Sequence, residues 1–434
     1  MSETLALNGG PKAITRTQEL AAASRWPVYS EEEQQAVVAA MRSDNVYADT
    51  AKFEEEFAAY HGARYALAHC NGSSSIHAAL FAVGVQPGDE VITSPYTWHL
   101  QAGQIVALHA LPVFCDINPR SACIEPEEIR RNITPRTRAI VVVHPFGAVA
   151  PMDEIMAIAR EHNIPVIEDC SHAHGATYKG QKVGTFGDIG CFSLQASKLM
   201  NAIEGGILIT NSERYYARAC ALAHYEHLPK LSLEEYRRFH DPTKEQAPTC
   251  FGFKYRIHPL ASAIARVQLA HLDDWNARRR RNMGYLTQRI AEVGRDILLP
   301  PYESADMVRT WLNYICIYTP ERTGVPRETF LKALQAEGLP ATGGRQGYLP
   351  IYWNPLYEER VSIWGEGDPF DAPWVKEKIE YRRGLCPVAE RLWRQCIGLP
   401  MLHWETRREL LDEIVYAIEK VVCNLDSLRE GPQA

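Results

Sequence analysis

The sequence predicts an α/β protein with a large, mostly parallel sheet domain and a smaller C-terminal α/β domain. Between about residues 60 and 215, short apolar runs alternate with helix-sized segments, which is the pattern of βαβ units. The runs are apolar throughout, as in strands that are buried on both faces. A long helical pattern at 259–293 then precedes a second group of strands and helices. We therefore expect a large domain at 1–275 and a small domain at 276–434.

The elements of the large domain can be placed in order along the chain. A first helix is expected to begin after Ser30, which can form a capping box with Glu33. The order of the strands within the sheet does not follow from the sequence. Strands are expected at 64–70, 89–94, 111–117, 138–144, 165–170, 191–194 and 206–211, and helices at 74–83, 99–110 and 153–163.

The remainder of the chain begins with a change in composition. The segment 226–252 is polar, charged and punctuated by proline, and we expect it to be an exposed excursion. The helix at 259–293 would then bridge the two domains. In the small domain we expect a strand at 311–318 and helices at 327–338 and 407–422.

Composition excludes several classes of function. The chain has 434 residues and a net charge of −7, so no overall positive field draws it to nucleic acid or to an anionic membrane. It has no apolar run long enough to span a bilayer and no signal-peptide pattern. Its 11 cysteines include no C-x-x-C pair, which is typical of reduced thiols rather than of zinc ligands. We therefore expect a cytoplasmic protein without a metal site.

Four groups of residues follow expected strands, and ligands of open α/β sheets bind at the carboxyl ends of the strands. The first group is Asn71-Gly72-Ser73-Ser74-Ser75. Glycine permits a tight turn, and the amides and hydroxyls at the start of the following helix favour an anion such as phosphate. The same residues could equally form an ordinary turn and helix cap.

Thr97-Trp98-His99 forms the second group, just after the strand expected at 89–94. The indole of Trp98 could lie flat on a planar ligand. Packing in the core or at an interface is the alternative interpretation.

The third group runs from Glu168 to Gly175 and ends an apolar strand. Acidic residues in such a place are costly to bury unless they are paired. The Asp169 carboxylate could pair with a protonated ring nitrogen, bind a metal beside His172 and His174, or form a structural ion pair.

Lys198 closes the fourth group, which begins at Ser193 and is followed by Glu204. It is the one charged residue between 191 and 203. Such a lysine could form a Schiff base with a carbonyl compound, or it could be a solvated surface lysine.

Together the four groups describe one site for pyridoxal phosphate. A lysine binds the cofactor's aldehyde, and an aspartate keeps the pyridine nitrogen protonated so that the ring can accept electrons. The glycine-containing turn would hold the phosphate, and the aromatic residue would cover the ring.

The chain resembles the DegT/StrS-like family of fold type I, pyridoxal-phosphate-dependent aminotransferases, which act on keto-sugars and keto-cyclitols. The resemblance covers nearly the whole chain. The start LALNGGPKA and the chain length are most similar to the scyllo-inosose and aminoshikimate branch. The segments that carry the resemblance include FEEEFAAYHGARYALAHCNGSSSIHAALFAVGVQPGDEVITSPYTW, VIEDCSHAHGATYKGQKVGTFGDIGCFSLQASK, EGGILITN and FGFKYRIHPLASAIARVQLAHLD.

The resemblance implies catalytic and ring-binding roles for four residues. Lys198 would carry the cofactor, and Asp169 would pair with the pyridine nitrogen. His172 would lie near the phenolic oxygen, and Trp98 would stack on the ring.

The resemblance also implies how the phosphate is bound. Ser73, Ser74 and Ser193 would hold it within one chain. Lys254 stands where the family often has an asparagine that reaches the cofactor phosphate of the neighbouring subunit. A homodimer with shared active sites is therefore expected.

The implied reaction moves an amino group from glutamate or glutamine to a keto-sugar or keto-cyclitol. Some relatives have histidine in place of the Schiff-base lysine and catalyse dehydration. Because Lys198 is present, transamination is the preferred interpretation. A dehydratase or another pyridoxal-phosphate enzyme on a sugar substrate, or a regulatory relative without activity, remains the alternative.

Overall fold

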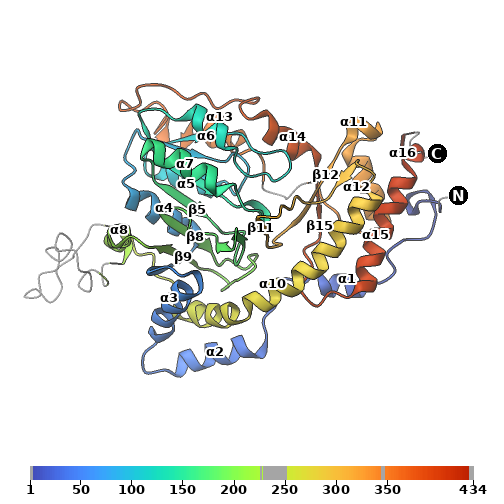
Figure 1. Cartoon of the computed structure of the whole chain (residues 1–434), viewed down its shortest axis with the longest axis horizontal. Helices are drawn as coiled ribbons and strands as arrows, with labels where there is room; N and C mark the ends of the chain where they lie inside the picture. Colours follow the sequence, from blue (N-terminus) through green and yellow to red (C-terminus); the bar gives the residue numbers. More distant parts are fainter. Residues whose placement is uncertain (1–2, 225–226, 228–251, 344–347, 430–434) are drawn as a thin grey trace, which may run out of the picture.

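The computed structural model of the protein describes residues 3–224, 227, 252–343 and 348–429. Seven strands form one sheet in the order β1-β9-β8-β5-β4-β2-β3, and β5, β8 and β9 of this sheet are labelled in Figure 1. The five strands from β8 to β3 are parallel, and β9 is antiparallel to both of its neighbours. The predicted mostly parallel α/β sheet is therefore confirmed. The strands are β1 (Tyr65–His69), β2 (Glu90–Thr93), β3 (Leu111–Phe114), β4 (Thr137–Val143), β5 (Val166–Asp169), β8 (Ile189–Ser193) and β9 (Gly206–Thr210).

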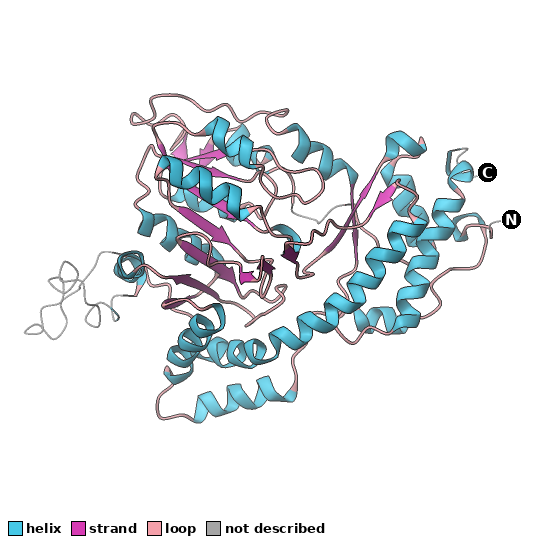
Figure 2. Cartoon of the chain, in the orientation of Figure 1, coloured by secondary structure: helices cyan, strands magenta, loops and turns pink. Residues whose placement is uncertain are grey.

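Helices cover both faces of the sheet (Figure 2). Ile140 and Val142 of β4 enter one hydrophobic core, whereas Ala139 and Val141 enter the other. This period of two is expected of a strand that is buried on both faces. The first face is covered by α3 (Ala48–His61), α6 (Pro126–Asn132), α7 (Met152–His162) and part of α10, and the second by α4 (Gly72–Val83), α5 (Leu100–Ala107) and α8 (Glu213–Ala223).

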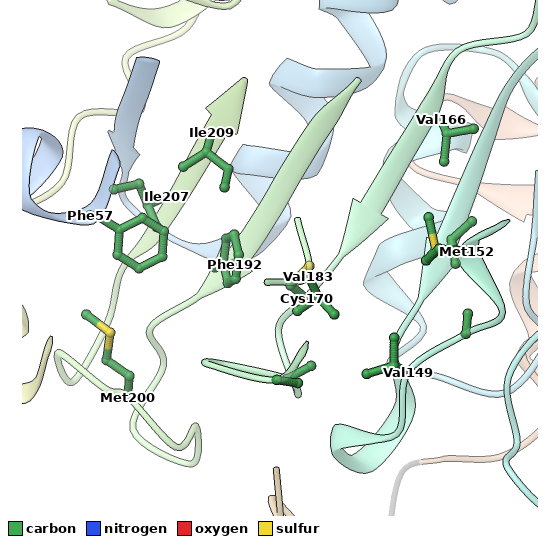
Figure 3. Close-up of a cluster of buried hydrophobic side chains, with 14 of the residues drawn as sticks. Phe57, Val149, Met152, Val166, Cys170, Val183, Phe192, Met200, Ile207 and Ile209 are labelled. Atoms are coloured by element: carbon green, nitrogen blue, oxygen red, sulfur yellow. The ribbon is translucent and has the colours of Figure 1, made fainter. Parts of the chain in front are cut away.

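The first of these cores fixes the strands that lead to the candidate site (Figure 3). Phe57 of α3 and Phe192 of β8 are fully buried, and their rings meet edge to face at 5.0 Å. Ile207 and Ile209 of β9 belong to the same core. Burial of each such side chain stabilises the fold by about 1.5–3 kcal/mol, so the end of β8 is firmly positioned.

The predicted long helix is confirmed as α10 (Pro259–Val293). Its proline occupies the first turn, where a missing N–H costs nothing. Leu269 and Leu272 pack against the large sheet, whereas Met283 and Leu286 belong to a second core. The helix thus crosses from one core to the other (Figure 1). The predicted boundary at 275/276 falls inside it and stays a prediction.

The second core surrounds a three-stranded antiparallel sheet in the C-terminal part of the chain. Leu5, Ile14 and Leu20, from near the start of the chain, are buried in this core together with Ile414 and Val421. Its elements are β10 (Leu298–Leu299), β12 (Tyr314–Tyr318), α12 (Arg327–Ala336), β15 (Cys396–Leu399) and α15 (Arg408–Cys423). A neighbouring helix, α14 (Pro387–Gln395), instead places Ala389 and Leu392 in a separate core with Phe114.

Several elements differ from their expected bounds or were not expected. The helix expected at 99–110 ends at Ala107, and the strand expected at 311–318 begins at Tyr314. The segment 226–252 lies almost wholly outside the described residues.

In the described part of the chain, no helix has both the length and the apolar content needed to cross a membrane. Further elements are α1 (Thr17–Ala23), α2 (Glu31–Arg42), β6 (Thr177–Tyr178), β7 (Gln181–Lys182), β11 (Met307–Val308), α11 (Pro320–Thr323), α13 (Pro355–Glu358), β13 (Val361–Ser362), β14 (Gly365–Glu366), α16 (Leu425–Arg429), and the 3-10 turns η1 (Ala6–Asn8), η2 (Pro145–Gly147) and η4 (Ile351–Trp353).

Candidate active site

A cavity of about 610 Å³ lies at the carboxyl ends of β1, β2, β5 and β8. The residues that follow these strands line it, and Tyr348 joins them from the C-terminal part of the chain. Its size suits a small-molecule cofactor together with a substrate. The predicted site residues that line it are Ser73, Trp98, Asp169, His172, Ser193 and Lys198.

The start of α4 forms one end of the cavity. A side chain at Gly72 would place its Cβ only 2.6 Å from Cβ of Ser193, so only glycine lets the helix approach β8 this closely. Ser73 and Ser193 both line the cavity here. The free backbone N–H groups and partial positive charge of a helix N-terminus favour an anion.

Ser74, predicted as a third phosphate ligand, is not among the residues that line the cavity. Its hydroxyl donates to the carbonyl oxygen of Asn71 at 2.7 Å. Its backbone N–H donates to the Asn71 side chain at 2.8 Å, and the Asn71 N–H donates to its Oγ at 3.2 Å. Ser74 therefore forms the capping box of α4, and its role toward phosphate stays a prediction.

The two acidic residues at the end of β5 face different surroundings. Asp169 lines the cavity and accepts a hydrogen bond from the N–H of Ser171 at 3.1 Å. Glu168 is fully buried, and its carboxylate accepts backbone N–H groups from Gly184, Phe186 and Gly187 at 2.7–2.8 Å. Because successive side chains of a strand point to opposite faces, Glu168 holds the loop at 184–187, whereas Asp169 is available to a ligand.

Among the described residues, the one group whose ligand atoms lie close enough to hold a metal differs from the Asp169, His172 and His174 considered from the sequence. His144, Glu168 and Cys170 offer ligand atoms within 4.8 Å of one another. Glu168 already accepts three N–H groups, however, and His144 lies 3.0 Å from it through Nε2. Burial also raises the pKa of the Cys170 thiol well above its usual value, whereas a metal needs the thiolate. This cluster is better explained as a structural network.

His172 is held on both ring nitrogens. Its Nδ1 accepts the backbone N–H of Phe146 at 3.4 Å, and Oη of Tyr348 lies 3.0 Å from its Nε2. The ring of Phe146 stacks on the imidazole with centroids 5.9 Å apart. These contacts fix the plane of the imidazole at the cavity wall.

His174 lies behind this wall and does not line the cavity. It is 1% exposed, and burial, with a smaller contribution from the charge of Lys198, lowers its pKa to about 3. The ring is therefore neutral near pH 7. Its carbonyl oxygen accepts a hydrogen bond from Asn276 of α10 at 2.8 Å, which ties the strand-end loop to the long helix.

Lys198 lies on a loop that folds back between β8 and β9. It is only 8% exposed and lines the cavity. Backbone hydrogen bonds close the loop beneath it, from Ala202 to Leu194 and from Ala196 to Ile203. Asn201 anchors the loop to Tyr29, whose hydroxyl donates to its amide oxygen. Lys198 is therefore a buried lysine on a loop held by hydrogen bonds, and the alternative of a solvated surface lysine is wrong.

The end of this loop contains a strained turn. Ile203 has a φ of +69°, and the N–H of Glu204 donates to the carbonyl of Ala202 at 2.8 Å. This arrangement is a γ-turn with the central residue at positive φ, which is costly for a β-branched side chain. The turn brings Glu204 to the cavity lining, where partial burial raises the pKa of its carboxyl.

The opposite wall is formed by the residues after β2. The side chain of Trp98 is 44% exposed at the cavity, and its ring meets Tyr348 edge to face at 6.3 Å. Gln101 accepts a hydrogen bond from Thr93 at 2.9 Å. Its buried Nε2 has no hydrogen-bond partner in the described part of the chain, so this donor is available for a ligand.

Lys254 is exposed and does not line the cavity of its own chain. It lies between Phe253 and Tyr255, whose rings stack with centroids 5.3 Å apart. The segment is fixed to the large sheet, because the N–H of Cys70 donates to the Tyr255 carbonyl at 2.5 Å. A role of Lys254 at the phosphate site of a neighbouring subunit remains a proposal.

Sequence reasoning missed Tyr348 and Gln101. Tyr348 is 176 residues from His172 along the chain, and no local pattern signals that contact. Gln101 had a weak signal, because it lies three residues after Trp98 in a mostly apolar helix whose other polar side chain is Gln104.

Comparison with known proteins places this geometry in a family. The profile of the DegT/DnrJ/EryC1/StrS aminotransferase family matches residues 27–365. A putative L-glutamine:3-amino-2,3-dideoxy-scyllo-inosose aminotransferase of Streptoalloteichus tenebrarius is 34% identical over 87% of both chains. The L-glutamine:scyllo-inosose aminotransferase of Streptomyces griseus is 31% identical over 99% of both chains. Among solved structures, an aminotransferase from Psychrobacter cryohalolentis is similar, with a TM-score of 0.78, 29% identity, and coverage of 93% of this chain and 99% of that chain.

Proposed function

Because this chain belongs to the DegT/DnrJ/EryC1/StrS aminotransferase family, we propose that it transfers an amino group from L-glutamine, or from glutamate, to a keto-cyclitol, with pyridoxal phosphate as its cofactor. The observation that carries the proposal is the position of a buried lysine, Lys198, in the same cavity as Asp169. The sequence similarity to inosose aminotransferases supports the choice of acceptor.

The residues present fit pyridoxal phosphate. The close contact of Gly72 with Ser193 brings the N-terminus of α4 to the cavity, and the unpartnered Nε2 of Gln101 adds a donor. When bound, the cofactor supplies a carbonyl that exchanges with amino groups and a ring that delocalises electrons. Ser73 and Ser193 would hold its phosphate, and Trp98 would cover its ring.

Three side chains would have direct roles in the reaction. Lys198 would hold the cofactor through Nζ and, after release, carry the substrate proton on the same atom. Asp169 would keep the ring nitrogen protonated. His172, fixed by Phe146 and Tyr348, would present its imidazole to the phenolic oxygen.

The lining of the cavity supports an uncharged polyhydroxy acceptor over a nucleotide-linked sugar. Of the described residues around the cavity, Lys198 is the only lysine or arginine. A diphosphate is usually recognised by several such cations. Hydroxyl and amide side chains, which suit the hydroxyl groups of a cyclitol, are supplied by Ser73, Thr97, Gln101, Ser171, Ser193, Gln195, Ser197 and Tyr348.

The decisive assay offers the cofactor-loaded enzyme two classes of acceptor. Scyllo-inosose and 2-deoxy-scyllo-inosose should be aminated with L-glutamine, whereas nucleotide-linked keto-sugars should give little product. Lys198→Ala is the matched negative control. Preferential amination of the nucleotide sugars, or elimination of water without amine formation, would contradict the proposal.

We further propose that the enzyme is a cytoplasmic homodimer in which Lys254 serves the phosphate site of the other subunit. The exposure of Lys254 and the fixed segment around it support this. Mixed dimers of Lys198→Ala chains and Lys254→Glu chains test it. With shared sites, one site of each hybrid carries both defects and the other carries none, so activity should return after subunit exchange. Confirmed exchange without activity would show that Lys254 acts elsewhere.

A further inference from the structure

A second, much smaller cavity lies away from the active site. It has a volume of about 30 Å³ and shares no lining residue with the larger cavity. Three segments meet there: the turn at 120–122 after β3, the turn at Pro145 and Phe146, and the stretch from Pro301 to Arg309. Side chains of β12, α14 and β15 close it on the remaining side.

Arg309 is the first of two arginines in this cavity and is only 5% exposed. Its Nη1 donates to the Tyr302 carbonyl at 2.8 Å, and its Nη2 donates to the Phe146 carbonyl at 3.2 Å. Its Nε is buried and lacks a hydrogen-bond partner in the described part of the chain. Burial lowers its pKa to about 10, so the guanidinium still carries its charge at neutral pH.

Arg120 is the second arginine. Its Nη2 donates to the Pro300 carbonyl at 3.2 Å, whereas its buried Nη1 has no partner among the described residues. Neither arginine has a carboxylate oxygen within 4 Å in the described part of the chain. The exposed Glu303 is near enough to Arg309 to raise its pKa slightly against the effect of burial, but the two form no ion pair.

We propose that this cavity binds a small monovalent anion of the size of chloride between Nε of Arg309 and Nη1 of Arg120. A water molecule could accept both hydrogen bonds, but it would bring no negative charge to the buried guanidinium of Arg309, whose one compensating contact in the described part of the chain is the ring of Trp311, 4.4 Å from its Cζ. A halide ion accepts hydrogen bonds from the same N–H groups and also neutralises part of the positive charge of the two guanidinium groups. Ser121 also lines the cavity, and its hydroxyl, which accepts the N–H of Cys123 at 3.2 Å, keeps a proton to donate.

The volume favours a ligand of this class. A cavity of about 30 Å³ has room for one or two particles of the size of water. A halide ion fits within it, whereas a phosphate or a nucleotide would have to extend out of it. The anion would tie the three segments together directly behind Phe146, whose ring stacks on His172.

Bromide, which scatters X-rays anomalously, tests the site without any variant. Crystals of the cofactor-loaded enzyme grown in sodium bromide should show an anomalous peak between Arg120 and Arg309. A cavity holding only water in those crystals would overturn the proposal.

Thermal melting tests the same site in solution. At equal ionic strength, replacing gluconate by chloride or bromide should raise the melting temperature of the wild-type enzyme by about 1–3 °C. Arg120→Gln should lose this difference. The matched control Arg130→Gln, which removes an exposed arginine paired with Glu161, should keep it. A halide shift of unchanged size in Arg120→Gln would refute binding at this cavity.

Discussion

Oη of Tyr348 lies 3.0 Å from Nε2 of His172, which joins the C-terminal part of the chain to the end of β5. Because Nδ1 accepts the N–H of Phe146, the proton of the neutral imidazole belongs on Nε2 and is donated to the tyrosine oxygen. The pair therefore fixes both the tautomer and the plane of the ring.

Tyr348→Phe should lower kcat/KM by about fivefold, since a net hydrogen bond is worth about 1 kcal/mol and the imidazole would lose its orientation. Tyr381→Phe is the matched control, because its hydroxyl donates to the Pro112 carbonyl at 2.9 Å away from the cavity. Both variants should lose similar stability, but only Tyr348→Phe should lose activity. Equal kcat/KM values in the two variants would show that the hydroxyl of Tyr348 has no role in the reaction.

Lys198→Ala should abolish turnover, because no other lysine lines the cavity in the described part of the chain. Borohydride reduction of the wild-type enzyme loaded with cofactor should leave the label on the peptide that contains Lys198. Lys179, an exposed lysine paired with Asp153, serves as the control position for Lys→Ala. Label found on another lysine would disprove the assignment.

Asp169→Asn should reduce kcat by several orders of magnitude while weakening cofactor binding much less. The amide keeps the shape of the carboxylate but cannot stabilise a protonated ring nitrogen, which matters most in the transition state. Steady-state kinetics and equilibrium dialysis of the cofactor separate the two effects. Turnover close to the wild-type rate would exclude Asp169 as the partner of the ring nitrogen.

Gly72→Ala should weaken cofactor retention and destabilise the fold by about 1–3 kcal/mol, the usual range for overpacking. The new methyl group would stand 2.6 Å from Cβ of Ser193 and push α4 away from β8. Gly103→Ala in α5 is the control, since its nearest neighbour would be Leu100 at 3.7 Å. Denaturant unfolding and cofactor titration would both be measured, and normal cofactor affinity in Gly72→Ala would contradict the proposed phosphate site.

Acid should destabilise the protein through its buried histidines. Burial lowers the pKa of His61, His69 and His174 to about 3. Below about pH 6.5 these histidines bind protons in the unfolded chain but not in the folded chain. Their contribution to the free energy of unfolding is therefore fully present above pH 6.5 and is lost as the pH falls from 6.5 to 3. Each histidine should contribute up to about 1.4 kcal/mol per pH unit.

Urea unfolding at pH 7 and at pH 5.5 measures this dependence. His61→Leu should reduce the loss of stability between the two pH values, whereas replacing the more exposed His162 should not. An unchanged difference in His61→Leu would show that the ring is protonated in the folded protein or that its burial is not maintained.

Local signals in the sequence predicted much of the fold. The bounds of α10 were predicted, because a long helical pattern runs without interruption through the segment that the structure shows as Pro259–Val293. Strand order depends on contacts between segments far apart in sequence, and no local pattern encodes it. The same reason explains why the burial of Leu5 and Ile14 in one core with Val421 was not predicted.

The candidate site was predictable where each residue follows a strand of its own. The parallel strands bring Ser73, Trp98, Asp169 and Lys198 to one edge, so separate motifs converge. Ser74 shows the limit of this reasoning, because the preference of serine for helix caps competes with its use as a phosphate ligand.

The packing of the chain's beginning against its end has a consequence for synthesis on the ribosome. Leu5, Ile14 and Leu20 share one core with Ile414 and Val421, which emerge roughly 400 residues later, about 20–80 s at ordinary elongation rates. During that interval the large sheet can form, but the core that buries the amino-terminal segment stays incomplete. Chaperone demand should therefore concentrate on that segment, and destabilising changes in α15 should lower yield more than activity.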